Sequence, residues 1–231
     1  MVINDYVIRQ HGAIQMKTPD GSLKLIPLID KSDITQNMRD TVGNNFGWMG
    51  AVYYRIIEKQ AAGKNYYTLI GYDENSLKSN KKIIEVLTFN NGEPVFGGPY
   101  FSMPDNAMSK GFTNRVIMEY KKNASPRLTY DPEQDIIIME HLIPENGEPQ
   151  KKYTYVGDGD YEGLKWNNGK WVYIDKVYTQ ALKNGEAPIP DPLRDDKGNL
   201  DETKLKNNEV DKSDTTIVPV KPKLIPPKKR M

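Results

Sequence analysis

The sequence contains 231 residues, no cysteine, and 32 basic against 31 acidic side chains, which gives a formal net charge of +1. Without cysteine the chain has no disulfide, no thiolate nucleophile and no cysteine-ligated metal. The balanced charge gives no support for binding to nucleic acid or to an anionic membrane, and no apolar run approaches the roughly 20 residues of a transmembrane helix.

The first residues, MVINDYVIRQHGAIQ, lack the basic and apolar segments of a secretory signal. A strand-like pattern begins almost at once, and QHGAIQMKT reads like the interior of a domain. We therefore expect that an N-terminal portion is missing from this chain.

Most of residues 1–180 follow a strand pattern, with runs rich in Val, Ile, Tyr and Thr that are broken by Gly, Asn, Asp and Pro. The runs predicted as strands are 22–30, 49–59, 65–73, 82–89, 93–101, 114–122, 126–131, 135–143 and 169–175. Short connections between them favour antiparallel neighbours. The predicted fold is a mainly β domain, as an antiparallel meander, a sandwich or an open curved sheet.

Helix is predicted at two places only. Residues 33–42 fit a short helix with Asp33 as its N-cap, and residues 75–82 fit a helical turn.

Residues 181–231 differ in composition from the rest, because every aromatic residue lies at or before Tyr178 and seven of the 16 prolines lie in this segment. Such a segment buries too little apolar surface to offset the entropy of ordering, so we expect a flexible tail. Its last part is basic and is a candidate for binding a partner. The basic residues are Lys221, Lys223, Lys228, Lys229 and Arg230.

The stretch LKWNNGKWVY predicts a β-hairpin, because Asn168 and Gly169 suit a two-residue turn with positive φ at both positions. This turn fixes the register, with Trp166 opposite Trp171 and the adjacent aliphatic and aromatic residues on the same face. The face comprises Leu164, Trp166, Trp171 and Tyr173. Such a face either lines the core or, together with Tyr161, stacks on a ligand such as a sugar ring.

The preceding DGDYEG places Asp158, Asp160 and Glu162 at the alternate spacing found at the start of calcium loops. A complete EF-hand loop is excluded, because Gly169 stands where a bidentate Glu should close the site. A degenerate calcium site and a turn rich in Asp and Gly stay open as alternatives, and no other cofactor is predicted.

Only two histidines exist, His11 and His141. In a regular strand Glu140 and His141 point to opposite faces, so they cannot act directly on one atom, and we expect His141 to be structural. No common nucleophile, phosphate-binding or metalloprotease motif is present. Arg115 and Arg127 are predicted to lie at the surface and form ion pairs there.

Several stretches also carry a family resemblance: YYRIIE, KNYYTLIGYDENSLKSNKKIIEVLTF, GEPVFG, NRVIMEY, RLTYDPEQDIIIMEHLIP and YEGLKWNNGKWVYIDKV. Together, over residues 12–178, they resemble an uncharacterised family of mostly exported proteins from Bacteroidetes. The resemblance implies a periplasmic or other extracytoplasmic location, and it implies no activity and no catalytic residue.

Three functions follow as hypotheses. The first is a non-catalytic module of the cell envelope, such as a subunit of an assembly or secretion complex, that binds a protein partner through its sheet surface or its tail. The second is a module that binds carbohydrate or peptidoglycan through the aromatic face. The third is a hydrolase with Asp158, Asp160, Glu140 or His141 at its site.

Overall fold

The structure is a computed structural model that describes residues 8–104 and 111–178. Within these residues it contains β-strands and one short 3-10 helix, η1 (Lys152–Thr154), so the predicted mainly β fold is confirmed. The strands are β1 (His11–Met16), β2 (Lys24–Ile29), β3 (Gly43–Asn44), β4 (Val52–Ala61), β5 (Lys64–Asp73), β6 (Ser79–Asn90), β7 (Glu93–Phe96), β8 (Phe101–Ser102), β9 (Phe112–Thr113), β10 (Arg115–Lys121), β11 (Leu128–Asp131), β12 (Ile136–Pro144), β13 (Tyr155–Asn167) and β14 (Lys170–Ile174). No helix among the described residues has the length and apolar character needed to cross a bilayer.

The first large sheet is built around the long strand β6. Its order is β3-β7-β6-β5-β4, and β10 pairs with β6 outside this path. The same edge of β6 therefore pairs with two strands, because its first half lies beside β10 and its second half beside β7. All of these pairs are antiparallel, as the short connections predicted.

The second large sheet has the order β11-β12-β13-β14-β8-β9. One of its pairs is parallel, since β8 runs beside β14 with Phe101 opposite Trp171. Sequence reasoning expected antiparallel neighbours only. The exception arises because β8 follows β7 of the first sheet and enters the second sheet beside a strand that is distant in sequence.

The predicted Asn-Gly hairpin is confirmed. Asn168 and Gly169 have φ values of 43° and 91°, and the register of β13 with β14 places Trp166 opposite Trp171 and Leu164 opposite Tyr173. Glycine has no Cβ and adopts such angles without strain, so this short turn sets the pairing of both strands.

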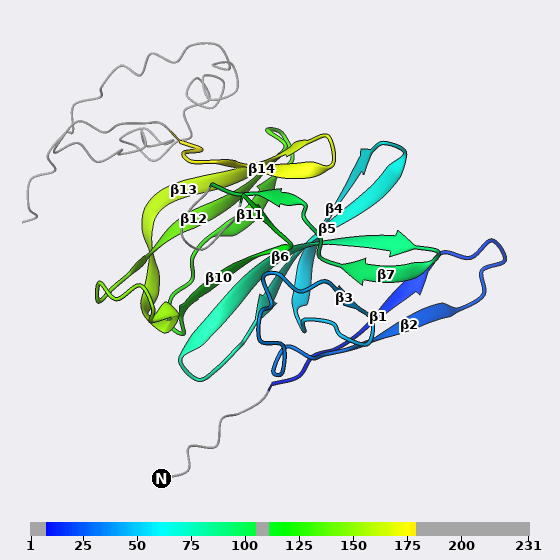
Figure 1. Cartoon of the computed structure of the whole chain (residues 1–231), viewed down its shortest axis with the longest axis horizontal. Helices are drawn as coiled ribbons and strands as arrows, with labels where there is room; N and C mark the ends of the chain where they lie inside the picture. Colours follow the sequence, from blue (N-terminus) through cyan, green and yellow to red (C-terminus); the bar gives the residue numbers. More distant parts are fainter. Residues whose placement is uncertain (1–7, 105–110, 179–231) are drawn as a thin grey trace, which may run out of the picture. The chain divides into compact units, whose positions relative to one another are not determined.

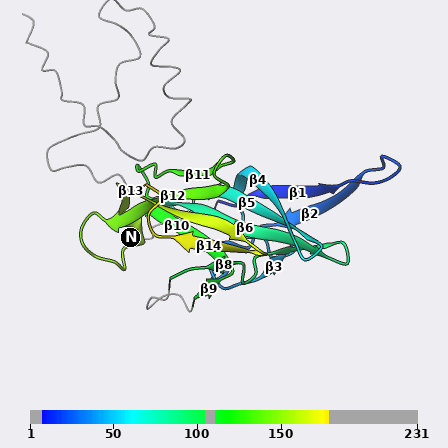
Figure 2. The same ribbon diagram turned by 90° about the horizontal axis from the view of Figure 1, so that it is seen from above.

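The two large sheets pack face to face, and their inner residues form the main core (Figure 2). β6 contributes Ile84 and Val86 from one side, and β12 to β14 contribute Ile137, Leu164 and Trp171 from the other. These residues are 0 to 1% exposed. The described part of the chain is therefore a β-sandwich, one of the predicted alternatives.

The opposite face of the first sheet is also covered. The hairpin β1–β2, drawn in blue in Figure 1, packs there through Leu28, and Trp48 from the loop between β3 and β4 joins Leu87 and Phe96. β6 is thus buried on both faces, which explains its nearly continuous apolar run.

Neither predicted helix is present. Most of residues 33–40 form turns, and the Met38 and Thr41 carbonyls accept hydrogen bonds from the Arg115 guanidinium instead of bonding along a helix. Asp33 does not act as a helix cap, since its carboxylate accepts a hydrogen bond from Arg9 at 2.6 Å. Within 75–82, the residues from Ser79 onward pair with β10 as the start of β6, so tertiary pairing overrides local preference.

We predict that Trp171→Ala lowers the free energy of unfolding by about 3 to 5 kcal/mol, because it empties a fully buried site. It also leaves the Thr68 hydroxyl without the indole N–H that donates to it at 2.8 Å. Urea unfolding measures the effect. The control is Val172→Ala, next in sequence but 38% exposed, which should cost under about 1 kcal/mol. Equal losses in the two variants would contradict the assignment of Trp171 to the core.

Candidate functional site

The predicted aromatic face lies between the sheets. Trp171 has 0% exposure, and the half-buried Trp166 packs against its ring with a T-shaped geometry and a centroid separation of 5.3 Å. Tyr173 is half-buried on the same inner face. Tyr161 lies apart from this group and contacts Tyr178. Trp171 therefore has no exposed surface with which to stack on a sugar ring.

The predicted metal-ligating residues lie on one strand. DGDYEG is part of β13, but its backbone is irregular at Gly159, which has a φ of 90° and lies where the pairing of β12 with β13 shifts register. Asp158 accepts a hydrogen bond from the backbone N–H of Asp160 at 3.0 Å. No group of three or more His, Asp or Glu side chains in residues 8–104 and 111–178 is arranged to hold a metal ion.

The structure brings His141 to these acids. Its Nδ1 lies 2.7 Å from Oδ2 of Asp158, and its Nε2 lies 3.7 Å from Oε1 of Glu162. Sequence reasoning missed this contact, because it depends on the pairing of β12 with β13 and on a register shift between Glu140 and Leu142. Glu140 is not part of the group, since its carboxylate accepts a hydrogen bond from the Arg127 N–H at 2.7 Å.

These contacts change the proton affinities of the group. Partial burial disfavours charge on both His141 and Asp158, but their hydrogen bond and mutual attraction act in the opposite direction. With the added charges of Glu162 and Asp160, the pKa of His141 is raised, and with the added backbone N–H of Asp160, the pKa of Asp158 is lowered. Burial, together with hydrogen bonding to Glu162 and Asp175, raises the pKa of the Tyr173 hydroxyl. Glu162 therefore contacts two polar side chains, the half-exposed His141 and the half-buried Tyr173, which faces the space between the sheets.

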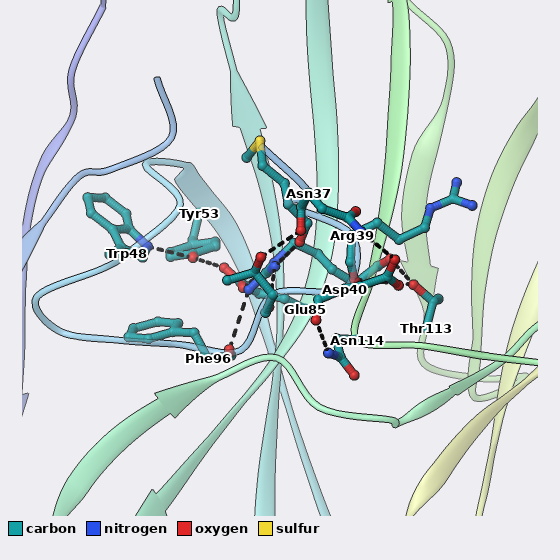
Figure 3. Close-up of polar contacts among 12 residues, drawn as sticks. Asn37, Arg39, Asp40, Trp48, Tyr53, Glu85, Phe96, Thr113 and Asn114 are labelled. Carbon is teal, nitrogen blue, oxygen red and sulfur yellow. Dashed lines mark hydrogen bonds and ion pairs between the residues drawn. The ribbon is translucent and has the colours of Figure 1, made fainter. Parts of the chain in front are cut away.

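A second polar group is fully buried. Arg115 on β10 and Glu85 on β6 stand opposite each other, each with a fully buried side chain, and Nε of Arg115 donates to Oε2 of Glu85 at 2.7 Å. The other oxygen of Glu85 accepts a hydrogen bond from Tyr53, whose own oxygen accepts one from the indole of Trp48 (Figure 3). Burial and the Glu85 charge raise the pKa of Tyr53.

The prediction that Arg115 lies at the surface is wrong. Arg115 lies on the face of β10 opposite to Val116 and Met118, and the sequence could not show that residues 37–41 cover this face. The Arg115 guanidinium donates to the carbonyl oxygens of Met38, Thr41 and Phe96. A lone Glu85 within the apolar run of β6 is the sequence signal that could have indicated a buried partner.

The buried pair fixes the position of residues 37–41. Asn114 donates to the Asp40 carbonyl at 2.6 Å, and Thr113 donates to the Arg39 carbonyl at 3.3 Å. Together with the bonds of Arg115, these contacts hold the backbone of Arg39 against β9 and β10.

An exposed apolar surface lies on the outer face of the hairpin β1–β2. Leu23, Leu25 and Ile29 are 74, 53 and 44% exposed, and Pro27 between them is exposed as well. The backbone N–H of Ile29 donates to the carbonyl of Asn45 at 2.7 Å, which places the backbone of residues 45 and 46 beside the end of β2, and the Phe46 side chain is 64% exposed. We call these five residues the hairpin surface: Leu23, Leu25, Pro27, Ile29 and Phe46.

The predicted partner-binding lysines of the tail lie outside the described residues. They are Lys221, Lys223, Lys228 and Lys229, together with Arg230.

Comparison with known proteins adds no assignment. A scan against protein-family models, a search of curated proteins and a search of solved structures each found no match to this chain.

We predict that His141→Gln lowers stability most between about pH 4 and 6.5. Because the pKa of His141 is raised in the folded protein, the stability that its ion pair contributes is fully present below its ordinary pKa of 6.5. This stability is lost as the pH rises through the pKa of the folded protein. Because the pKa of Asp158 is lowered in the folded protein, the stability that its carboxylate contributes is present above its ordinary pKa of 3.8. This stability is lost as the pH falls through the pKa of the folded protein. Since the His141 side chain is 41% exposed, the loss should stay below about 1 kcal/mol.

Urea unfolding at pH 5 and at pH 8.5 measures this difference. His11→Gln is the control, since it makes the same substitution at the other histidine, which lies on β1 away from Asp158 and Glu162. A loss for His141→Gln that is the same at both values of pH would show that the ion pair does not contribute.

Proposed function

We propose that this protein is a non-catalytic interaction module of the cell envelope that binds a protein partner through the hairpin surface. The observation that carries the proposal is the row of exposed apolar side chains on β2. The family resemblance of residues 12–178 supports the envelope location.

Strand β2 is apolar on both faces, but only one of these faces packs against other described residues. Leu28 is 9% exposed and packs on the first sheet, whereas the alternate positions Leu25 and Ile29 face outward. Side chains of a strand alternate between faces, so an outward apolar row requires apolar residues at every second position. Soluble proteins rarely keep such a patch unless it binds something.

The chemistry of the hairpin surface favours a protein over a glycan. Four of the five residues are aliphatic, and such side chains pack well against apolar side chains of another protein, whereas Phe46 is the one ring on this surface that a sugar could stack on. The two tryptophans best suited to a sugar ring, Trp166 and Trp171, face the core. Among the described residues, β1 pairs with β2 alone, which leaves its other edge able to accept a strand of a partner.

We predict that Leu25→Asp weakens partner binding about tenfold or more, because it puts a charge in the centre of the hairpin surface. The measurement is affinity purification from the native cell envelope after mild crosslinking, followed by titration of the purified partner. The control is Leu77→Asp, which places the same charge at a leucine that is 60% exposed in the turn before β6. Both variants are first checked for wild-type stability.

A partner that binds the wild type and Leu77→Asp, but not Leu25→Asp, is the expected result. A chain that ends at Ala181 tests the tail separately. Loss of the partner with the tail, but not with Leu25→Asp, would move the binding site to residues 182–231 and refute the hairpin surface.

A further inference from the structure

A small cavity with polar and apolar walls lies between the two large sheets. Its volume is about 140 Å³. An engineered cavity of roughly this size holds one benzene, so the cavity accepts a ligand of about six non-hydrogen atoms. The residues that line the cavity include Arg39, Met103, Thr113, Val116, Glu162 and Tyr173.

Two arginines line the cavity, and of these Arg115 is paired with Glu85 whereas Arg39 is not in an ion pair with a described residue. Among residues 8–104 and 111–178, no carboxylate lies within ion-pairing distance of the Arg39 guanidinium. Its backbone is held by Thr113, and in Figure 3 its side chain extends away from Glu85 on the side where Thr113 lies. The Arg39 guanidinium presents two parallel N–H donors, which match a carboxylate.

The cavity also contains an acceptor of opposite charge. Glu162 comes from β13, and its carboxylate has His141 on the surface side and the Tyr173 hydroxyl beside it. The Glu162 carboxylate would repel a ligand that carries only negative charge, such as phosphate. An ammonium group would be attracted to it. Met103 and Val116 supply apolar wall for a small aliphatic group.

We propose that this cavity binds a small zwitterion of the α-amino acid class, with Arg39 on the carboxylate and Glu162 on the ammonium group. Alanine, with six non-hydrogen atoms, fits the volume, and its methyl group meets the wall formed by Met103 and Val116. Arg39 also lines an open groove of about 590 Å³, so solvent reaches this residue from outside the cavity. The proposal does not depend on the hairpin surface.

The test is a titration of the full chain with L-alanine, followed by isothermal titration calorimetry and by amide chemical shifts. We expect one site of weak affinity, with the largest shifts at Thr113, Val116 and Tyr173. Acetate, which lacks the ammonium group, and ethylamine, which lacks the carboxylate, should each bind about 10- to 100-fold more weakly, because each leaves one charged partner unsatisfied.

Two variants assign the residues. Arg39→Gln and Glu162→Gln should each weaken alanine binding about 10- to 100-fold. The control is Arg55→Gln, an exposed arginine on β4 that does not line the cavity and should leave binding unchanged. No binding of L-alanine to the wild-type chain at about 20 mM, or acetate binding as tightly as alanine, would overturn the proposal whatever the variants do.

Discussion

A charged pair without contact with water, Arg115 with Glu85, is the constraint on which the rest of the described structure depends. Neither side chain has exposed surface, so each charge must find its partners inside the protein. Glu85 takes two donors, Arg115 and Tyr53, and Arg115 reaches three backbone carbonyls besides Glu85. No buried side-chain nitrogen or oxygen among the described residues is left without a hydrogen-bond partner.

These partners come from parts of the chain that are far apart. Tyr53 lies on β4, Phe96 on β7, and Met38 and Thr41 in the irregular segment between β2 and β3. The pair therefore ties the covering segment to the centre of the first sheet, and through Trp48 it reaches the layer that supports the hairpin β1–β2. Both proposed binding features follow from this anchoring, because it supports the hairpin surface from below and fixes the backbone of Arg39 at the cavity.

The sequence predicted what depends on local geometry. The Asn168-Gly169 turn fixed the pairing of Trp166 with Trp171, since the turn leaves no freedom of register. Most strands were predicted for the same reason, because alternation and turn residues are local. What failed depends on contacts distant in sequence: Arg115 looks like a surface residue until residues 37–41 cover it, and His141 meets Asp158 only through the irregular pairing of β12 with β13. The helix predicted at 33–42 gave way because the Met38 and Thr41 carbonyls are used by Arg115.

Amide hydrogen exchange in a chain that carries Glu85→Leu together with Arg115→Met tests most directly whether the buried pair holds residues 37–41 in place. Replacing both partners removes the pair without leaving a buried charge alone, so the fold as a whole should persist. If the buried pair holds the covering segment, the amides of Lys31, Thr41 and Trp48 will exchange at least about tenfold faster than in the wild type, while those of β12 and β13 keep their protection. Unchanged protection at Lys31, Thr41 and Trp48 would contradict this role of the pair, because the covering segment would then hold its place without the buried pair.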